Sequence, residues 1–162
     1  MPFWVYTDQD IYVREQERIF GGPYWSFVAL ECELPQSGDF KRTHIGDKSV
    51  IVMRDNQGAI NVVANRCAHR GIELCKEAFG NASELMCPYH QWTYDLRGNL
   101  TAVPLRRGLR KQGGMPDTFH LDEHGLHKLA VSERHGVVFA SFGQPPRFEE
   151  DLGSTMLGYF DR

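Results

Sequence analysis

Two cysteine–histidine pairs constrain this chain of 162 residues more than any other feature. Cys67 and His69 are separated by one residue, Cys87 and His90 are separated by two, and 17 residues (70–86) lie between the pairs. Thiolate and imidazole suit zinc or iron–sulfur chemistry rather than magnesium or calcium. Two short loops that face each other would bring the four donors to one point, so the sequence predicts a four-ligand metal centre.

The order of the donors bears on which kind of metal centre this is. A common zinc finger pairs cysteine with cysteine and histidine with histidine, whereas each loop here contributes one of each. The mixed order suits a [2Fe–2S] cluster that has two thiolates on one iron and two imidazoles on the other. Two alternatives stay open at this point: a zinc site of unusual ligand order, and four unrelated core and surface residues.

The composition is that of an ordinary globular protein with one sizeable domain. Hydrophobic residues make up 41% of the chain, and its net charge of −3 gives no reason to expect a nucleic-acid partner. The N-terminal residues lack the features of a signal peptide, and no apolar run is long enough to span a membrane. Four cysteines are too few for a disulfide scaffold, so we expect a cytoplasmic protein with reduced thiols.

The apolar pattern predicts an all-β fold with one N-terminal α-helix. Residues at helical spacing indicate a helix over about 8–20, begun by a capping box of Thr7 and Asp10. Short β-like runs separated by turn signals follow, which is typical of an antiparallel sandwich or barrel. Residues 105–124 are expected to form a long surface loop. The expected strands are 24–30, 41–45, 48–54, 59–64, 92–95, 100–103, 127–131 and 137–142.

The residues around the two pairs carry a wider resemblance. They resemble the Rieske signature, and more narrowly the Rieske domain of the large (α) subunit of aromatic-ring-hydroxylating oxygenases of the salicylate and anthranilate type. An entry segment and closing strands with similar residues extend the resemblance from about residue 3 to 145. The motifs that carry it are Cys67-Ala68-His69-Arg70-Gly71, Cys87-Pro88-Tyr89-His90 and Gln91-Trp92-x-Tyr94-Asp95-x-x-Gly98.

The resemblance implies a fold, a cofactor and a set of ligands. The fold would be an antiparallel β sandwich with an inserted cluster-binding subdomain, and the cofactor a Rieske-type [2Fe–2S] cluster. Cys67 and Cys87 would hold the inner iron, and His69 and His90 the solvent-facing iron. The implied divisions are an N-terminal helical entry segment (1–23), a Rieske domain (24–145) with its cluster-binding subdomain at about 62–104, and the start of a missing catalytic domain (146–162).

The resemblance also implies electron transfer in a multicomponent aromatic-ring dioxygenase or monooxygenase. Electrons would pass from an NAD(P)H-dependent reductase or a ferredoxin to a mononuclear non-heme Fe(II). That iron is expected only in the missing domain, so we expect no catalytic residues here and interpret the chain as an N-terminal fragment. The full-length subunit is expected to form a homo- or hetero-oligomer. The alternative is a stand-alone Rieske-type ferredoxin without oxygenase activity.

Two aromatic residues after the second pair lead to a prediction about the redox potential. Trp92 stands where respiratory-chain Rieske proteins have a serine, so no hydroxyl is offered to the cluster at this position. Hydrogen bonds to the sulfurs raise the potential of such a cluster. We therefore expect a potential at the low end of the Rieske range, with Trp92 and Tyr94 covering the cluster.

Two further groups of residues each have a functional interpretation and an ordinary one as surface residues. One group is interpreted as exposed loop and strand histidines rather than as iron ligands: His120, His124 and His127. The other is a basic run: Arg106, Arg107, Arg110 and Lys111. This run is either a docking surface for an acidic ferredoxin or reductase, since charge steers encounter, or simply a solvated loop.

Overall fold

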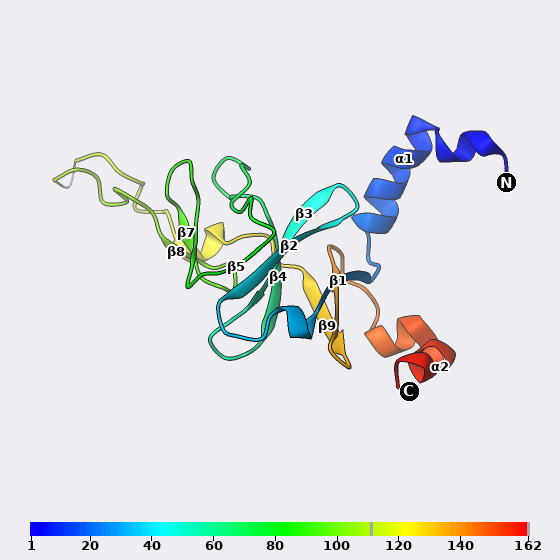
Figure 1. Ribbon diagram of the computed structural model, residues 1–162. Coiled ribbons are helices and arrows are strands. Elements are labelled where there is room, and N and C mark those ends of the chain that lie inside the picture. The colour runs from blue at the N-terminus through cyan, green and yellow to red at the C-terminus, as the bar shows by residue number, and fades with distance from the viewer. Residues whose placement is uncertain (111, 162) are drawn as a thin grey trace.

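The computed structural model describes residues 1–110 and 112–161, and all strand pairs within them are antiparallel. The fold contains three sheets of three, four and three strands, with a helix towards each end of the chain (Figure 1). The all-β expectation is therefore confirmed. Lys111 of the predicted basic run lies outside the described residues. No helix within those residues is long and apolar enough to cross a membrane.

The elements are short and closely spaced along the chain. The helical segments are η1 (Phe3–Tyr6), α1 (Gln9–Glu15), the π-helical turn η2 (Gln16–Phe20), η3 (Glu31–Glu33), η4 (Leu121–His124) and α2 (Phe148–Phe160). The strands are β1 (Ser26–Leu30), β2 (Asp39–Ile45), β3 (Lys48–Arg54), β4 (Ile60–Ala64), β5 (Phe79–Asn81), β6 (Leu85–Met86), β7 (Thr93–Tyr94), β8 (Leu100–Ala102), β9 (Ala130–Arg134) and β10 (Val137–Ser141).

β3 is central to the fold because both of its faces are buried. Val50 and Val52 pack into a first core, together with residues of the sheet β1–β10–β9. Ile51 and Met53 pack into a second core, which contains Cys67 and Cys87. A strand covered on both faces needs a continuous apolar run rather than an alternating one. Val-Ile-Val-Met provides that run, and the bounds predicted for this strand agree with the structure.

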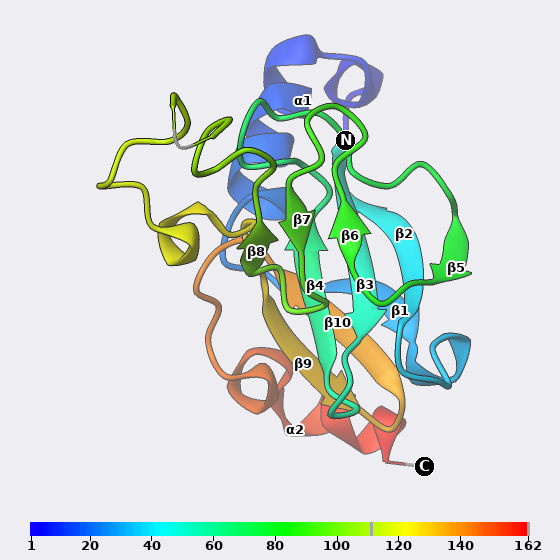
Figure 2. The same cartoon turned by 90° about the vertical axis from the view of Figure 1, so that its left-hand side faces the viewer.

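The second core lies between the four-stranded sheet β4–β3–β2–β5 and the small sheet β6–β7–β8, which stands in front of it in Figure 2. Tyr94 of β7 and Leu100 of β8 are buried there with Val63 of β4. The first cysteine–histidine loop follows β4, and the second connects β6 to β7. β5 and β6 are absent from the predicted strands, because runs of three and two residues are too short to show alternation.

β9 lies three residues later than expected. The stretch predicted as a strand, 127–131, begins beside β4 instead: Lys128 forms a single bridge with Val63, and the Leu129 N–H donates to the Val62 carbonyl at 2.9 Å. Regular pairing with β10 starts only at Ala130. The chain therefore passes from one sheet to the other within the segment that the apolar pattern marks as one strand.

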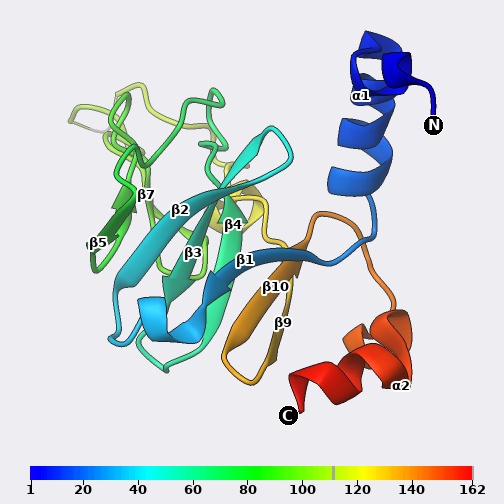
Figure 3. The ribbon, with the colours of Figure 1, turned by 45° about the vertical axis from the view of Figure 1, so that its right-hand side comes forward.

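The N-terminal helix begins at a different cap from the one predicted. Asp8 is the cap, rather than Thr7, and its side chain accepts hydrogen bonds from two backbone N–H groups of the first turn, both at 3.0 Å. The helix continues into η2, where the Gln16 side chain accepts the backbone N–H of Asp47 at 2.9 Å. This contact ties α1 to the β2–β3 turn, beside which it stands in Figure 3.

α2 adds a second helix to the predicted fold. Its sequence carries Gly153, which has a φ of +69° and kinks the helix, and glycine lowers helix propensity. Long-range contacts hold the helix instead. Phe148 is buried, with its ring centroid 5.7 Å from that of Trp25 and 4.7 Å from that of Phe139. Trp25 is more than a hundred residues away from Phe148 along the chain, and Phe139 is nine residues away. No local sequence pattern therefore predicts both contacts.

Asp55 and Arg97 tie the two layers of the second core together. The Asp55 side chain is almost fully buried, and it accepts hydrogen bonds from the backbone N–H groups of Gln57 (2.9 Å) and Ala59 (3.0 Å) in its own turn. It also accepts the Arg97 Nε–H at 2.7 Å from the β7–β8 turn. Burial alone would raise the pKa of Asp55, but these hydrogen bonds together hold that pKa below its ordinary value.

Asp55→Asn should lower the free energy of unfolding by about 1–3 kcal/mol at pH 7, because Arg97 loses an anionic partner. The folded-state pKa of Asp55 lies below the unfolded value, so its contribution is present above about pH 4 and is lost as the pH falls through the folded pKa. Denaturant unfolding of both proteins between pH 7 and pH 3 is the measurement. The gap between them should close towards acid pH, and a constant gap would contradict this role of the ionised side chain.

Candidate metal centre

The first cysteine–histidine loop is closed by two backbone hydrogen bonds on its cysteine. The Cys67 carbonyl accepts the N–H of Gly71 at 2.8 Å, and the Cys67 N–H donates to the Ile72 carbonyl at 2.9 Å. The return requires a left-handed residue, and Gly71 supplies it with a φ of +71°. A Cβ at Gly71 would also lie 2.7 Å from Nε of Arg66. Glycine adopts this conformation without strain, and the atoms nearest to the position of its missing Cβ belong to the flexible end of the Arg66 side chain.

The second loop has the same construction. The Cys87 carbonyl accepts the N–H of Gln91 at 2.9 Å, and the Cys87 N–H donates to the Trp92 carbonyl at 2.8 Å. Gln91 takes the left-handed position with a φ of +56°, a conformation that costs a non-glycine residue roughly 1–2 kcal/mol. In both loops the chain thus returns to its cysteine after four and five residues, and the histidine lies inside the turn.

The two loops bring the four predicted ligands together. The side chains of Cys67 and Cys87 are buried in the second core, and neither forms a disulfide. His69 is exposed and His90 is half-buried, and their rings meet edge to face with centroids 4.7 Å apart. The thiols therefore lie inside and the imidazoles lie towards the surface.

The donor atoms fit a mixed-ligand iron–sulfur cluster. Nδ1 of His90 is buried and has no hydrogen-bond partner within the described residues, although such an atom costs about 1–3 kcal/mol when it is left unpaired. Partial desolvation of its ring, with the nearby charges of His90 and Arg70, lowers the pKa of His69, which favours the neutral imidazole that binds metals. Within residues 1–110 and 112–161, no three Cys, His, Asp or Glu side chains are grouped as the ligands of a single metal ion would be. This agrees with a Rieske cluster, in which each iron has only two protein ligands.

A family match covers the same region of the chain. The Rieske [2Fe-2S] domain matches residues 24–113, which is 90 of the 162 residues. The chain belongs to the Rieske [2Fe–2S] domain family. The cofactor of this Rieske domain is therefore a [2Fe–2S] cluster, as the donor order predicts.

Large subunits of oxygenases are among the relatives of this Rieske domain. The salicylate 5-hydroxylase large oxygenase component of Ralstonia sp. is 56% identical over 167 residues, and the anthranilate 1,2-dioxygenase large subunit of Burkholderia cepacia is 48% identical over 163. Both matches cover all of this chain but only 40% and 38% of those proteins, so the chain spans about two fifths of their length. The structure of naphthalene 1,2-dioxygenase from Rhodococcus sp. bound to indole matches with a TM-score of 0.83 and 32% identity, over 94% of this chain and 34% of that one. The resemblance to oxygenase large subunits is confirmed.

Tyr94 lies against the inner cysteine of the first loop. Its hydroxyl oxygen is 3.2 Å from Cys67 Sγ and accepts the backbone N–H of Ala68, also at 3.2 Å. Either group could donate when Cys67 is a thiol, but a metal-bound Cys67 is a thiolate without a hydrogen, so the hydroxyl is then the donor. Burial, and then the neighbouring Cys67, raise the pKa of Tyr94 above its ordinary value. Tyr94 therefore remains a protonated donor at the buried sulfur.

An aromatic stack covers the outer histidine of the first loop. Trp92 is almost fully buried, and its ring stacks on His69 with centroids 4.7 Å apart and planes at 10°. Trp92 also meets Phe119 edge-on at 5.8 Å and His124 at 6.0 Å, and these two rings stack on each other at 4.4 Å. The prediction that His124 is an exposed loop residue is therefore wrong. The other two histidines of that group are exposed, as predicted.

Asn65 anchors the chain around the first loop. Its buried side chain accepts the N–H groups of Leu74 and Cys75 through Oδ1, both at 3.0 Å. Through Nδ2 it donates to the Cys75 carbonyl at 2.7 Å and to Oγ of Ser49 at 3.1 Å. The segment after the first loop is thus fixed to β3. Sequence reasoning missed this residue, because a single asparagine whose partners are nine to sixteen positions away leaves no local pattern.

Proposed function

We propose that Cys67, His69, Cys87 and His90 are the protein ligands of the cluster, with both cysteines on one iron and both histidines on the other. The observation that carries the proposal is the equivalence of the two loops, each of which closes on its cysteine by the same hydrogen bonds and offers one buried thiol and one imidazole. The unpartnered Nδ1 of His90 supports it. The thiols inside and the imidazoles outside agree with the ligand order that the family resemblance implies.

We propose that one-electron transfer is the work of this domain. A bound Rieske cluster supplies a one-electron couple whose potential depends on its ligands and on hydrogen bonds to its sulfurs. The chain contributes the environment of that couple. Tyr94 donates to the sulfur of Cys67, Trp92 shields one face of His69 from water, and the exposed edge of His69 leaves a surface for a redox partner.

We further propose that the whole protein is an aromatic-ring-hydroxylating oxygenase. In it, electrons from an NAD(P)H-dependent reductase or a ferredoxin would pass through this domain to a mononuclear non-heme iron held elsewhere. The relatives support this, since they are large subunits of a salicylate hydroxylase and an anthranilate dioxygenase. Their designation as large subunits also supports an assembly of several chains. The four free cysteines are in keeping with the cytoplasm, where thiols stay reduced.

For the organisation of the chain, we propose a Rieske domain over 24–145 with a cluster-binding subdomain at about 62–104. The last strand, β10, ends at Ser141, and the range 62–104 contains both loops and the whole sheet β6–β7–β8, which supports these bounds. Residues 1–23 would be the entry segment that carries α1. Residues from 146, which include α2, would lead into a catalytic domain.

Loss of the cluster tests the ligand set. Cys67→Ser and His90→Ala should each lose most of the iron, the acid-labile sulfide and the visible absorption, because one iron loses a protein ligand. Cys75→Ser is the matched control, since Cys75 is also a buried free cysteine, and it should keep about two irons per chain. Iron and sulfide analysis with visible and electron paramagnetic resonance (EPR) spectra are the measurements. A colourless zinc protein, or cluster loss in the Cys75 variant alone, would contradict the proposal.

Tyr94→Phe should lower the reduction potential by roughly 20–60 mV. The hydrogen bond to sulfur favours the reduced, more negative state by about 0.5–1.5 kcal/mol, and a one-electron couple moves about 59 mV for each tenfold change. Redox titration is the measurement, with Tyr89→Phe as a control because the Tyr89 hydroxyl lies near Arg70 instead. The wild-type potential should lie low within roughly −150 to +300 mV. A value above about +150 mV, or no change in Tyr94→Phe, would refute this account.

A further inference from the structure

We propose that a surface made by residues 105–110 and 112–116, here called the arginine arm, together with Phe119, is the docking site for the acidic face of the protein that reduces the cluster. The proposal rests on the electron-transfer function proposed above. Three observations carry it: the arm is a folded structure, its arginines are unpaired beside a pocket, and a chain of rings runs from that pocket to His69.

The arginine arm is held in shape by its backbone. It extends from the end of the molecule at which β7 and β8 lie (Figure 1). Leu109 and Gln112 exchange two backbone hydrogen bonds at 3.0 Å, and the Met115 N–H donates to the Arg106 carbonyl at 2.9 Å. A Cβ at Gly108 would lie only 1.9 Å from the carbonyl oxygen of Gly113, on the returning half of the arm. These contacts between the two halves of the arm fix the course of its backbone.

The charge of the arginine arm is free to meet a partner. Arg106, Arg107 and Arg110 are exposed, and within the part of the chain that the structure describes none of them has an ion pair or a side-chain hydrogen bond. The chain as a whole carries a net charge of −3, so the positive surface is a local feature. Arg106 and Arg107 line a pocket of about 430 Å³ together with Asp117, so its lining carries two guanidinium groups and one carboxylate. Guanidinium groups bind carboxylates in a two-pronged geometry, so a partner rich in Asp and Glu fits this surface.

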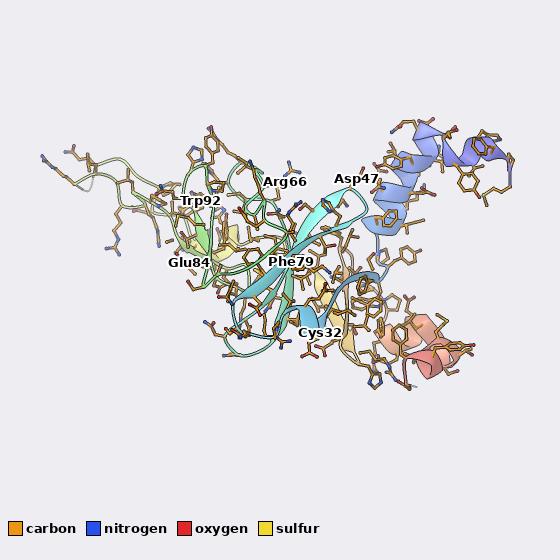
Figure 4. All side chains as sticks on the ribbon, in the orientation of Figure 1. Cys32, Asp47, Arg66, Phe79, Glu84 and Trp92 are labelled. Atoms are coloured by element: carbon orange, nitrogen blue, oxygen red, sulfur yellow. The ribbon has the colours of Figure 1, made fainter. Side chains whose placement is uncertain are left out.

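The same pocket leads to one of the proposed cluster ligands. Phe119 lines the pocket beside the two arginines, its ring lies 5.8 Å from Trp92, and Trp92 stacks on His69 at 4.7 Å. Figure 4 shows Trp92 at the end of the molecule from which the arm extends. A donor seated at the pocket would be separated from His69 by two packed rings rather than by water. Electron transfer slows steeply with distance, so this continuity is what distinguishes an electron donor from any other acidic partner.

Charge reversal on the arm tests the docking site. Arg106→Glu/Arg107→Glu is compared with Arg14→Glu/Arg18→Glu, which makes the same change in net charge at exposed positions of α1 and η2. The cluster-loaded chain is mixed with a reduced, acidic plant-type [2Fe–2S] ferredoxin, and reduction is followed by stopped-flow absorbance. At an ionic strength of about 0.01 M the arm variant should be reduced at least about tenfold more slowly than the control. At about 1 M salt, where charges are screened beyond about 3 Å, the two rates should converge.

Phe119→Leu tests the ring path separately. Leucine keeps an apolar side chain in the pocket but removes the ring between the arm and Trp92. The limiting rate of reduction at saturating ferredoxin should fall several-fold, while the salt dependence should stay that of the wild type because both arginines remain. An unchanged limiting rate would overturn the path through Phe119.

The outcomes separate this inference from the function on which it rests. Equal rates for the arm variant and its control at low salt would overturn the docking site and leave electron transfer intact. If the two rates are equal, and if the wild-type protein and the control self-associate but the arm variant does not, the arm is an interface with a second copy of this chain instead. Failure of the ferredoxin to reduce the wild-type protein at any salt concentration would count against the electron-transfer function itself.

Discussion

The site depends on a loop that returns to its own cysteine within five residues. The cysteine carbonyl and N–H both take part in the closure, so the positions of the thiol and of the histidine inside the turn are fixed together. The closure needs a left-handed residue four positions after the cysteine, which is Gly71 in one loop and Gln91 in the other. Two such loops side by side define four donors with little freedom to separate.

The layered fold determines what surrounds those donors. β3 carries an apolar core on each face, and the second of these cores buries the sulfurs of Cys67 and Cys87. The imidazoles lie at the outer margin of the same core, where Trp92 covers His69 on one face. A dry environment around the sulfurs, with one accessible imidazole, is what an electron relay needs, because burial and hydrogen bonding set the potential while the exposed edge admits a partner.

The parts that could be predicted from the sequence are those with a local cause. The spacing of cysteine and histidine predicts two loops that meet, and the continuous apolar run of β3 predicts a strand with the observed bounds. The parts that could not be predicted depend on distant partners. α2 is anchored by the contact of Phe148 with Trp25, and His124 is half-buried because Phe119 and Trp92 lie against it. The Asp55–Arg97 pair joins two turns forty-two positions apart, and neither turn signals the other.

Mixed ligation by two cysteines and two histidines is the central claim, and pulsed EPR of the reduced protein tests it most directly. Protein labelled with ¹⁵N only at histidine should show two strongly coupled ¹⁵N nuclei, one from each imidazole on the outer iron. The His90→Ala chain, if it retains any cluster, should lose one of them. A reduced wild-type cluster that couples to one histidine nitrogen or to none would contradict the account.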